Sequence, residues 1–341
     1  MEQTSNQSEN VYPVDVVITW VDGNDVAWQE EKAKYAPANK AFKAASGTLR
    51  YRDWENLQYL FRGIEKFMPW VNRVFFITWG HIPSWLDTTC EKLRIVRHDE
   101  FIPEEYRPTF NSNTIELNLH RIPDLSERFI NFNDDMFVIG STKKEDFFEN
   151  GLPKTAAILS PYPITPQGIA CTEVNNLEII NTHFSTKDVK KNKKKWFSVK
   201  YGKKALRTLL FMNFGSVLGI YEPHTPLSLC KSNLELLWEM HPDVFENTSS
   251  HKFRTKEDIN IWLVRQWQIM TGAFTPRSVK FEKLATLPRG EETALELLAS
   301  CGACRLLCVN DSLGVDDFDE MKKKINGAFE RLLPEKSKFE L

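Results

Sequence analysis

A strand that runs into two adjacent acids constrains the fold of this chain more than any other segment. In the stretch 129–140, aromatic and branched residues alternate with small polar ones on both sides of Asn133-Asp134-Asp135, the pattern of a strand ending in an acidic turn. Ligands of open α/β sheets bind at the carboxyl ends of the strands, and paired carboxylates suit a hard divalent cation that holds a phosphate. Taken alone, the three residues fit an exposed Asx turn equally well.

Four further apolar runs predict strands of the same sheet. They cover residues 14–21, 74–79, 94–98 and 305–309. The first is almost continuously β-branched, as expected of a strand buried on both faces of a parallel sheet. The second and third are separated by the length of a strand–helix–strand unit. We therefore predict an α/β fold with a Rossmann-like, mainly parallel sheet flanked by helices.

Acids follow two of these strands as well. Residues 14–21 run into a turn that contains Asp22 and Asp25, and residues 305–309 run into Asp311. With the acidic pair of the stretch 129–140, three predicted strands end in aspartates. In a single sheet these carboxylates would gather at one edge, around a shared cation or phosphate.

Two helices are expected in the first part of the chain, over residues 26–34 and 54–67. Asp53 is well placed to be the N-cap of the second helix. Arg52, beside this helix start, would make a good anion cradle. Surface charges at a helix start fit the same residues about as well.

Residues 108–113 lead into a predicted helix that contains Glu116, His120 and Arg121. The glutamate and the histidine are four residues apart, so both side chains would face the same way. A lone helical histidine is more often structural than functional. Its place on a polar face just before the acidic strand end favours contact with a ligand.

Residues 151–220 are expected to leave the core as an irregular or helical insertion. The part 151–181 is rich in Pro and Thr with few periodic runs, which predicts irregular structure. Within residues 187–207, nine lysines and one arginine are crowded around Trp196, Phe197 and Tyr201. Such a block fits a solvated face, or equally a surface for an anionic acceptor or an anionic membrane.

Two further residues stand out as candidates for chemistry. His224 lies between two prolines, a rigid and non-helical setting that suits a positioned proton acceptor. Thr255 and Asp258 predict a capping-box-like start for a helix through Trp262, which would place Arg254 at the helix N-terminus.

Composition and length limit the classes of protein to consider. The net charge of −2, from 44 basic and 46 acidic residues, argues against a dedicated nucleic-acid binder. Residues 1–10 are polar, with neither a secretory signal nor an anchor, and no apolar run reaches the roughly 18 to 20 residues of a membrane-spanning helix. We therefore expect a cytoplasmic protein, either soluble or peripheral on the inner face of a membrane.

The six cysteines include a cluster, Cys301, Cys304 and Cys308, with the spacing C-x2-C-x3-C. With no export signal, reduced thiols are expected. A fourth zinc ligand at the usual spacing is missing, so free thiols are favoured over a metal site.

Four blocks lie in order along the chain: Asp15–Asp25, Arg50–Phe148, His224 with Phe253-Arg254, and Cys308–Asp311. They resemble the conserved regions of the Stealth family of sugar-phosphate transferases. This family includes bacterial capsular polysaccharide phosphotransferases and the animal enzyme that adds N-acetylglucosamine-1-phosphate to lysosomal glycoproteins. The resemblance covers most of residues 14–313 and departs from the family in the linking segments, especially 151–220, where acceptor choice is expected to reside.

The resemblance implies an enzyme of the phosphotransferase (EC 2.7) type, active in capsular or cell-surface polysaccharide synthesis. It would transfer hexose-1-phosphate from a nucleotide sugar, a UDP-hexose or UDP-N-acetylhexosamine, to a hydroxyl of a free or lipid-linked glycan. The products would be a phosphodiester and a nucleoside monophosphate. A metal-dependent glycosyltransferase using the same donor is the alternative, and a non-catalytic sugar-binding relative is disfavoured because a base, an arginine and acids are all present.

Phosphoryl transfer requires a cation on the pyrophosphate, an arginine on developing charge and a base for the incoming hydroxyl. His224 is the expected base, and Arg254, helped by Arg52, would hold the phosphates. Asp134 and Asp135 would bind Mg²⁺ or Mn²⁺, with help from another strand-end acid. The catalytic residues expected are His224, Arg254, Asp134 and Asp311, and the expected substrate-binding residues are Arg52, Asp53, Asn111, Ser112, Asn113, Glu116, His120, Arg121, Asp22 and Asp25.

The 341 residues suffice for one large α/β domain or a core with a substantial insertion. We expect the catalytic core in two parts, 11–150 and 221–315. The insertion 151–220 separates them, and an amphipathic helix within 316–341 closes the chain.

Overall fold

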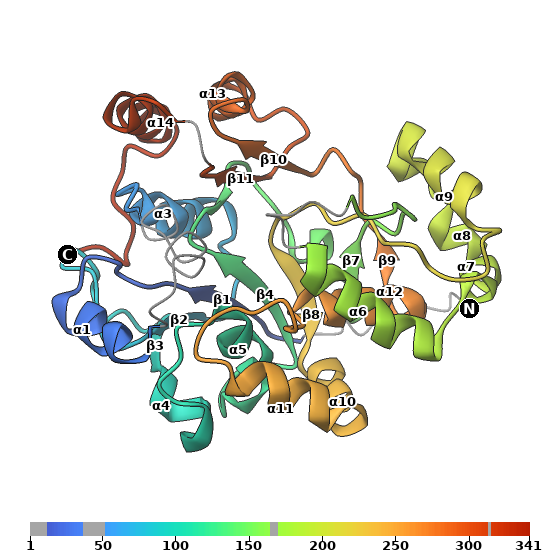
Figure 1. Ribbon diagram of the computed structural model, residues 1–341. Helices are drawn as coiled ribbons and strands as arrows, with labels where there is room; N and C mark the ends of the chain where they lie inside the picture. The colour runs from blue at the N-terminus through green and yellow to red at the C-terminus, as the bar shows by residue number, and fades with distance from the viewer. Residues whose placement is uncertain (1–11, 37–51, 164–169, 313–314) are drawn as a thin grey trace, which may run out of the picture.

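The computed structural model describes residues 12–36, 52–163, 170–312 and 315–341, so the expectation for residues 1–10 lies outside the described residues. A five-stranded sheet in the order β3-β2-β1-β4-β8 forms the centre of the molecule (Figure 1). Strands β1 to β4 are parallel, and β8 runs antiparallel to β4 at one edge. The strands are β1 Val14–Thr19, β2 Val74–Thr78, β3 Leu93–Arg97, β4 Arg128–Asn133 and β8 Leu227–Cys230.

Burial on both faces explains why β1 reads as a continuous apolar run. Val16 and Ile18 pack into the core on one side of the sheet, and Val17 packs into the core on the other side. The same alternation holds for Phe76 and Phe75 in β2. The predicted mainly parallel sheet is therefore confirmed for four of its five predicted strands.

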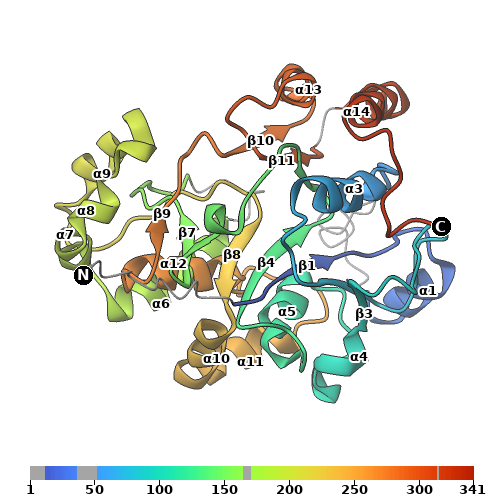
Figure 2. The ribbon, with the colours of Figure 1, turned by 180° about the vertical axis from the view of Figure 1, so that it is seen from behind.

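Helices cover both faces of the central sheet, as Figures 1 and 2 show from opposite sides. Helix α3, Leu57–Phe67, lies on one face. The other face is covered by α5 Ser112–Leu117, α10 Lys231–Met240, α11 Pro242–Ser250 and α12 Trp262–Met270. Other short helices are α1 Val26–Tyr35, α4 His98–Phe101 and the 3₁₀ helices Glu104–Tyr106, Leu119–Arg121, Lys144–Asp146 and Val199–Lys204.

The strand predicted at 305–309 exists as β11, Leu306–Asn310, but its assignment to the main sheet is wrong. It belongs to a second sheet of order β10-β11-β5, with β10 Glu282–Thr286 and β5 Met136–Val138. The chain turns at the acidic pair after β4 and continues as β5, which pairs antiparallel with β11. Two helices cover this sheet, α13 Glu291–Ala299 and α14 Phe318–Leu332, and α14 confirms the predicted C-terminal helix (Figure 1).

The chain between residues 151 and 220 is more regular than predicted. It contains β7 Leu152–Thr155 and the helices α6 Ala170–His183, α7 Thr186–Lys191, α8 Lys193–Trp196 and α9 Ala205–Phe211. The prediction of irregular structure is wrong for residues 170–181, which form α6 and contact α12. Strand β7 joins β6 Phe148–Glu149 and β9 Thr275–Pro276 in a small third sheet. Among the described helices, none combines the length and apolar character needed to cross a membrane.

Candidate active site

The predicted acids lie at the carboxyl edge of the central sheet, where β1 and β4 are neighbours. Thr19 pairs with Asn133, so the turn after β1 and the acidic pair after β4 leave the sheet at the same level. Strands β2 and β3 follow one another on one side of β1, and β4 lies on the other side of β1, so the strand order reverses between β1 and β4. Such a reversal of strand order is where open α/β sheets bind their ligands.

The second sheet brings β11 to the same place. The backbone N–H of Val309 donates to the carbonyl oxygen of Asp135 (2.9 Å), and the Cys308 thiol donates to Oδ2 of Asp135 (3.2 Å). Ligand atoms of Asp135, His224 and Cys308 lie within 4.8 Å of one another, an arrangement that could hold a metal ion. The acidic turn, the predicted base and the end of β11 therefore share one site.

His224 is held in an unusual backbone conformation. Its φ of 52° lies in the left-handed region, which non-glycine residues seldom adopt and which is found most often at functional sites. The imidazole meets the indole of Trp262 edge-on, with ring centroids 5.5 Å apart. The next residue, Thr225, donates its hydroxyl to Oε2 of buried Glu282 (2.9 Å). These contacts fix the loop and aim the imidazole at the acidic turn.

Asp134 is an exposed residue and Asp135 a half-buried one, but the carboxyls of both lie in crowded surroundings without enough compensating positive charge. Desolvation by the surrounding protein, and then the neighbouring Asp135, raise the pKa of Asp134 to about 7, and Asp53 adds to this rise. Burial also raises the pKa of Asp135, against the opposing effect of His224. Oδ1 of Asp135 is buried and accepts no hydrogen bond from any described residue. Carboxylates in this state are suited to bind a cation.

Glu116 of α5 joins the site from the face opposite α3. Burial raises its pKa to about 7, and Asp135 adds to the rise, whereas Arg254 and a hydrogen bond with Asn131 of β4 oppose it. Glu116 is therefore close enough to interact electrostatically with both Asp135 of the acidic turn and Arg254. Its carboxyl is poised to change charge near neutral pH.

His120 and Arg121 do not share this position. Helix α5 ends at Leu117 and a separate 3₁₀ helix begins at Leu119, so the prediction that Glu116 and His120 face the same way on one helix is wrong. The change of helix type rotates the later side chains away, and both contact Trp238. The His120 ring lies 5.7 Å from this indole and the Arg121 guanidinium 4.7 Å from it. Burial lowers the pKa of His120 to about 3.

Arg254 reaches the site from a loop. The predicted helix start at Thr255 is wrong, because α12 begins only at Trp262. Instead, Asp258 folds back to accept the backbone N–H of Thr255 (3.1 Å) in a turn. The Arg254 guanidinium donates through Nη2 to the hydroxyl of Ser112, the first residue of α5. The arginine is therefore positioned by a side chain of another element.

The other two predicted residues of this segment support that loop. Asn111 and Asn113 are buried and donate their side-chain amides to Oδ2 of Asp258, at 2.9 and 3.1 Å. His251 contacts the second oxygen of the same carboxylate at 2.8 Å. The two asparagines thus tie the Arg254 loop to α5, with Ser112 between them.

Arg52 is paired with Asp311 rather than free. The guanidinium donates from Nε to Oδ2 (2.9 Å) and from Nη2 to Oδ1 (2.7 Å), and the Trp54 indole N–H also reaches Oδ2 (3.2 Å). The prediction that Asp53 caps the following helix is wrong. Its carboxylate accepts the backbone N–H of Glu55 (2.7 Å), and α3 begins later, after Asn56.

Asp22 and Asp25 shape the turn after β1. Asp25 is the N-cap of α1 and accepts the backbone N–H of Trp28 (2.7 Å), while Asp22 accepts that of Asn24 (2.8 Å). The backbone N–H of Asp22 donates to Nε2 of His81 (2.8 Å), a residue that the sequence reasoning missed. Its position directly after a predicted strand was the available signal.

A cavity of about 540 Å³ opens beside this turn, at the carboxyl ends of β1, β2 and β3. Its lining includes Asp25, His81, Arg97 and Arg107. Burial lowers the pKa of His81, although Asp25 and Asp22 oppose this effect. The cavity therefore offers polar side chains of both signs next to the acidic edge of the sheet.

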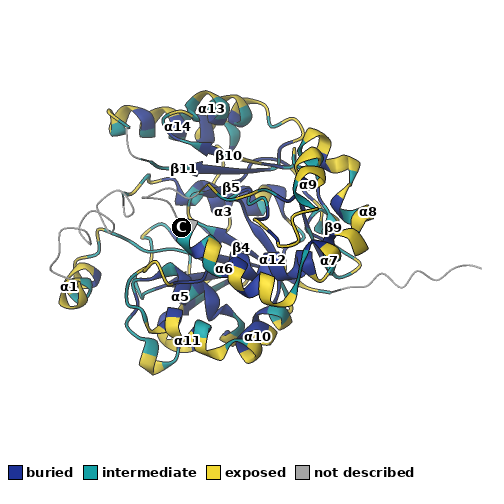
Figure 3. Ribbon diagram, turned by 45° about the vertical axis from the view of Figure 1, so that its right-hand side comes forward, coloured by how far each residue is buried: buried dark blue, intermediate teal, exposed yellow. Residues whose placement is uncertain are grey.

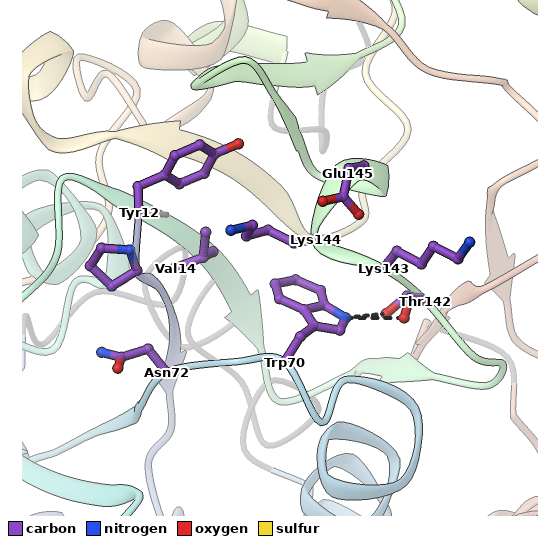
Figure 4. Close-up of a pocket in the computed structure, with 9 residues that line it drawn as sticks. Tyr12, Val14, Trp70, Asn72, Thr142, Lys143, Lys144 and Glu145 are labelled. Atoms are coloured by element: carbon purple, nitrogen blue, oxygen red, sulfur yellow. Dashed lines mark hydrogen bonds between the residues drawn. The ribbon is translucent and has the colours of Figure 1, made fainter. Parts of the chain in front are cut away.

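A cavity of similar volume, about 550 Å³, lies near the amino end of β1, at the opposite ends of the strands from the acidic turn (Figure 4). It is lined by residues at the amino end of β1, such as Tyr12, and by Trp70, Lys143 and Lys144. The Trp70 indole N–H is fixed by the carbonyl oxygen of Thr142 (3.1 Å). None of the predicted site residues lines this cavity, and the acids of β1 and β4 leave from the other end of the strands.

The clustered cysteines are not joined in disulfides. Cys301 and Cys304 do not take part in the group of side chains, found within the described part of the chain, that could hold a metal ion. Cys308 does reach that arrangement, through Asp135. Burial and Asp135 raise the pKa of its thiol, so the sulfur keeps its proton and acts as a hydrogen-bond donor.

Comparison with known proteins agrees with the resemblance. Profiles of Stealth protein conserved regions 1, 2 and 3 match residues 12–40, 50–155 and 223–269. The chain is 41% identical to capsular polysaccharide phosphotransferase WcwK of Streptococcus pneumoniae, over 97% of this chain and 99% of that protein. It is 40% identical to receptor polysaccharide phosphotransferase WefC of Streptococcus gordonii, over 97% of this chain and 100% of that protein.

Among solved structures, galactosyltransferase LgtC in complex with donor and acceptor sugar analogs aligns with 95% of this chain and 96% of its own. The sequence identity is 11% and the TM-score 0.42. The two named phosphotransferases share about two identical residues in five with this chain over nearly its whole length. The profile matches include the acidic turn, His224 and Arg254. This chain therefore belongs to the Stealth family of phosphotransferases.

Proposed function

We propose that this protein transfers hexose-1-phosphate from a nucleotide sugar to a hydroxyl of a glycan, in the synthesis of a capsular or cell-surface polysaccharide. The observation that carries the proposal is the meeting of His224 with Asp135 of the acidic turn, near Glu116, whose pKa Asp135 raises and Arg254 lowers. Base, acids and arginine are the parts that phosphoryl transfer needs. The names of the relatives, capsular and receptor polysaccharide phosphotransferases, support the same reaction class.

The cavity beside Asp25 and His81 is the proposed place of the donor nucleotide. It lies at the strand ends next to the acidic turn, so a bound nucleotide would direct its pyrophosphate along the edge between β1 and β4. Arg97 and Arg107 in the lining would balance the negative charge of the donor.

Asp134 and Asp135 would hold a divalent cation, Mg²⁺ or Mn²⁺. The unpartnered Oδ1 of Asp135 and the raised pKa values of both carboxyls fit this role, because a cation favours the charged form of each. Hard cations prefer oxygen ligands, so the protonated thiol of Cys308 positions Asp135 instead of binding the ion. When bound, the cation would neutralise the pyrophosphate of the donor.

His224 would take the proton of the acceptor hydroxyl, and the nearby Asp135 carboxylate would stabilise the imidazolium that forms. The acceptor oxygen forms a bond to the phosphorus that carries the sugar. The bond from this phosphorus to the bridging oxygen breaks, and the nucleoside monophosphate leaves with that oxygen. Arg254 would hold the non-bridging oxygens of the transferred group. The hydroxyl of Ser112 aligns its guanidinium, and the carboxyl of Glu116, when ionised, would partly balance its positive charge.

Product analysis tests the proposal directly. The protein is incubated with a panel of UDP- and GDP-sugars, a glycan acceptor, and Mg²⁺ or Mn²⁺. We expect release of UMP or GMP and a new phosphodiester signal in the ³¹P NMR spectrum of the glycan. Release of UDP or GDP with a new glycosidic bond would identify a glycosyltransferase instead. Donor binding without any turnover would indicate a sugar-binding protein.

A further inference from the structure

Helix α9 carries an apolar stripe that faces away from the protein. Leu206, Leu209 and Leu210 have the i, i+3, i+4 spacing that normally turns toward a core. Their side chains are instead 61%, 54% and 66% exposed. Thr208, on the other side of the helix, is fully buried and accepts the backbone N–H of Leu159 (3.1 Å). The helix is therefore attached through Thr208 and the partly buried Ala205 and Phe211, and it presents its leucines to the surroundings.

Two further apolar residues flank this stripe in the chain. Val199, in the 3₁₀ helix that contacts α9, is 95% exposed, and Phe214, just beyond α9, is 63% exposed. We call the set Val199, Leu206, Leu209, Leu210 and Phe214 the α9 face. Figure 3 shows α8 and α9 as largely exposed helices at the margin of the molecule. So many large apolar side chains without cover indicate a surface that meets something apolar.

The surroundings of the α9 face are strongly basic. Residues 187–214 contain ten basic residues and a single acid, Asp188, which is paired with Lys191 (2.8 Å). Lys193, Lys194 and Arg207 are exposed. Of the three aromatic residues expected at this surface, Trp196 and Tyr201 are fully buried and Phe197 is 37% exposed. The apolar part of the surface therefore comes chiefly from leucines, with lysines beside them.

We propose that the α9 face docks on the surface of an anionic phospholipid bilayer. Its leucines and Phe214 would enter the boundary between headgroups and acyl chains, and the lysines would lie among the negative headgroups. The exposed apolar side chains match the apolar boundary of the bilayer, and the large excess of positive charge matches its negative headgroups. A face between two copies of the chain would bring the two basic clusters together, which is unfavourable.

The α9 face is linked to the loop of the predicted base. Lys204, at the start of α9, lies 3.8 Å from the ring of Tyr221, three residues before His224. Docking would hold this loop close to the bilayer. Resting on the proposed function, this placement suits an acceptor glycan anchored in the membrane by a lipid.

Vesicle flotation with the full chain tests the docking without donor or acceptor. Vesicles of phosphatidylcholine with and without phosphatidylglycerol are compared at low and high salt. The test variant is Leu209→Ser with Leu210→Ser. The matched control is Leu236→Ser with Met240→Ser, two partly exposed apolar residues on α10. A third variant, Lys193→Gln with Lys194→Gln, removes two of the charges.

We expect the wild type and the α10 control to bind the anionic vesicles and to bind pure phosphatidylcholine weakly. The partition coefficient of the leucine variant onto anionic vesicles should be lower by about tenfold or more, because two leucines no longer enter the apolar boundary. The lysine variant should lose binding to anionic vesicles in a salt-dependent way. Unchanged circular dichroism spectra, and unchanged turnover of a water-soluble acceptor by the leucine variant, would separate docking from folding and from the proposed reaction.

Three results would overturn the proposal. The first is no binding of the wild type to anionic vesicles at low salt. The second is equal binding by the leucine variant, which would leave the lysines alone responsible. The third is a change from dimer to monomer in the leucine variant in light scattering, which would identify the α9 face as a contact between copies of the chain.

Discussion

Arg52 and Asp311, 259 positions apart in the chain, form a two-pronged ion pair that ties the segment before α3 to the end of β11. The pair is partly buried, and the Arg52 guanidinium also lies over the ring of Phe318 at 4.2 Å. The charge of Arg52 is thus already matched. Of Arg52 and Arg254, Arg254 is therefore the one expected to hold the oxygens of the transferred phosphoryl group.

A double-mutant cycle with Arg52→Gln and Asp311→Asn measures this pair. We expect a coupling of about 1 to 3 kcal/mol in the free energy of unfolding, because the bonds are charge-assisted and partly shielded from water. Arg97 and Asp99, an exposed pair 3.2 Å apart, provide the comparison and should couple more weakly. Urea denaturation gives all the values. Additive effects of the two changes would show that the pair does not stabilise the fold.

Asp134→Asn and Asp135→Asn should each lower metal-dependent turnover by roughly 10²-fold or more while leaving the protein folded. The pKa of Asp134 is raised from its ordinary value of 3.8 to about 7, so the stability that its proton contributes is fully present below pH 3.8 and is lost as the pH rises through 7. Without metal at pH 8, Asp134→Asn should therefore raise the free energy of unfolding, but by less than at a fully buried carboxylate, because Asp134 is exposed and water screens its charge. Full activity of either variant at saturating metal would remove that residue from the proposed ligands.

Glu116→Gln should change stability in a pH-dependent way. The pKa of Glu116 is about 7 in the folded protein, against an ordinary value of 4.5, so the wild type loses stability as the pH rises between these values. The glutamine variant escapes that loss. Its advantage in the free energy of unfolding should grow from near zero at pH 4 to roughly 3 kcal/mol at pH 8. Exposed Glu105→Gln serves as the control. A flat difference across this range would contradict the buried, protonated carboxyl.

His224→Ala should lower kcat by roughly 10² to 10⁴, the usual effect of losing a general base. His183→Ala, a change at an exposed histidine of α6, should leave kcat as it is. Steady-state kinetics with saturating donor and acceptor make the comparison. A near-normal kcat with a raised KM would limit His224 to substrate binding and direct the search for the base to Asp22, Asp25 and Asp311.

Arg254→Lys should also be a poor enzyme. A lysine carries the charge but cannot offer the planar fork that meets two phosphoryl oxygens at once. Ser112→Ala should show a smaller loss, because it removes only the contact that aligns the guanidinium. Equal kcat values for Arg254→Lys and the wild type would mean that Arg254 supplies no more than a point charge.

The strands of the central sheet could be predicted from the sequence because burial on both faces leaves continuous apolar runs such as Val14–Thr19. The sheet to which Leu306–Asn310 belongs could not, because an apolar run does not identify its partners. Two predictions about helices were wrong for local reasons. Glu116 and His120 do not share one helix, because the helix type changes at Asn118. No helix starts at Thr255, and the carboxylate of Asp258 accepts hydrogen bonds from Asn111 and Asn113. The grouping of Asp135 with His224 and Cys308 depends on the second sheet, which the periodicity does not reveal.

The passage of the chain from one sheet to another at Asp134-Asp135 has a consequence for ligand binding. Strand β4 belongs to the central sheet and β5 to the second, and the two carboxylates lie in the turn between them. A cation with its pyrophosphate would therefore fasten the two sheets to each other. We expect donor occupancy to slow amide hydrogen exchange in β10 and β11, which lie in the second sheet. Binding of the donor at the central sheet would thus reduce local opening of strands that lie outside that sheet.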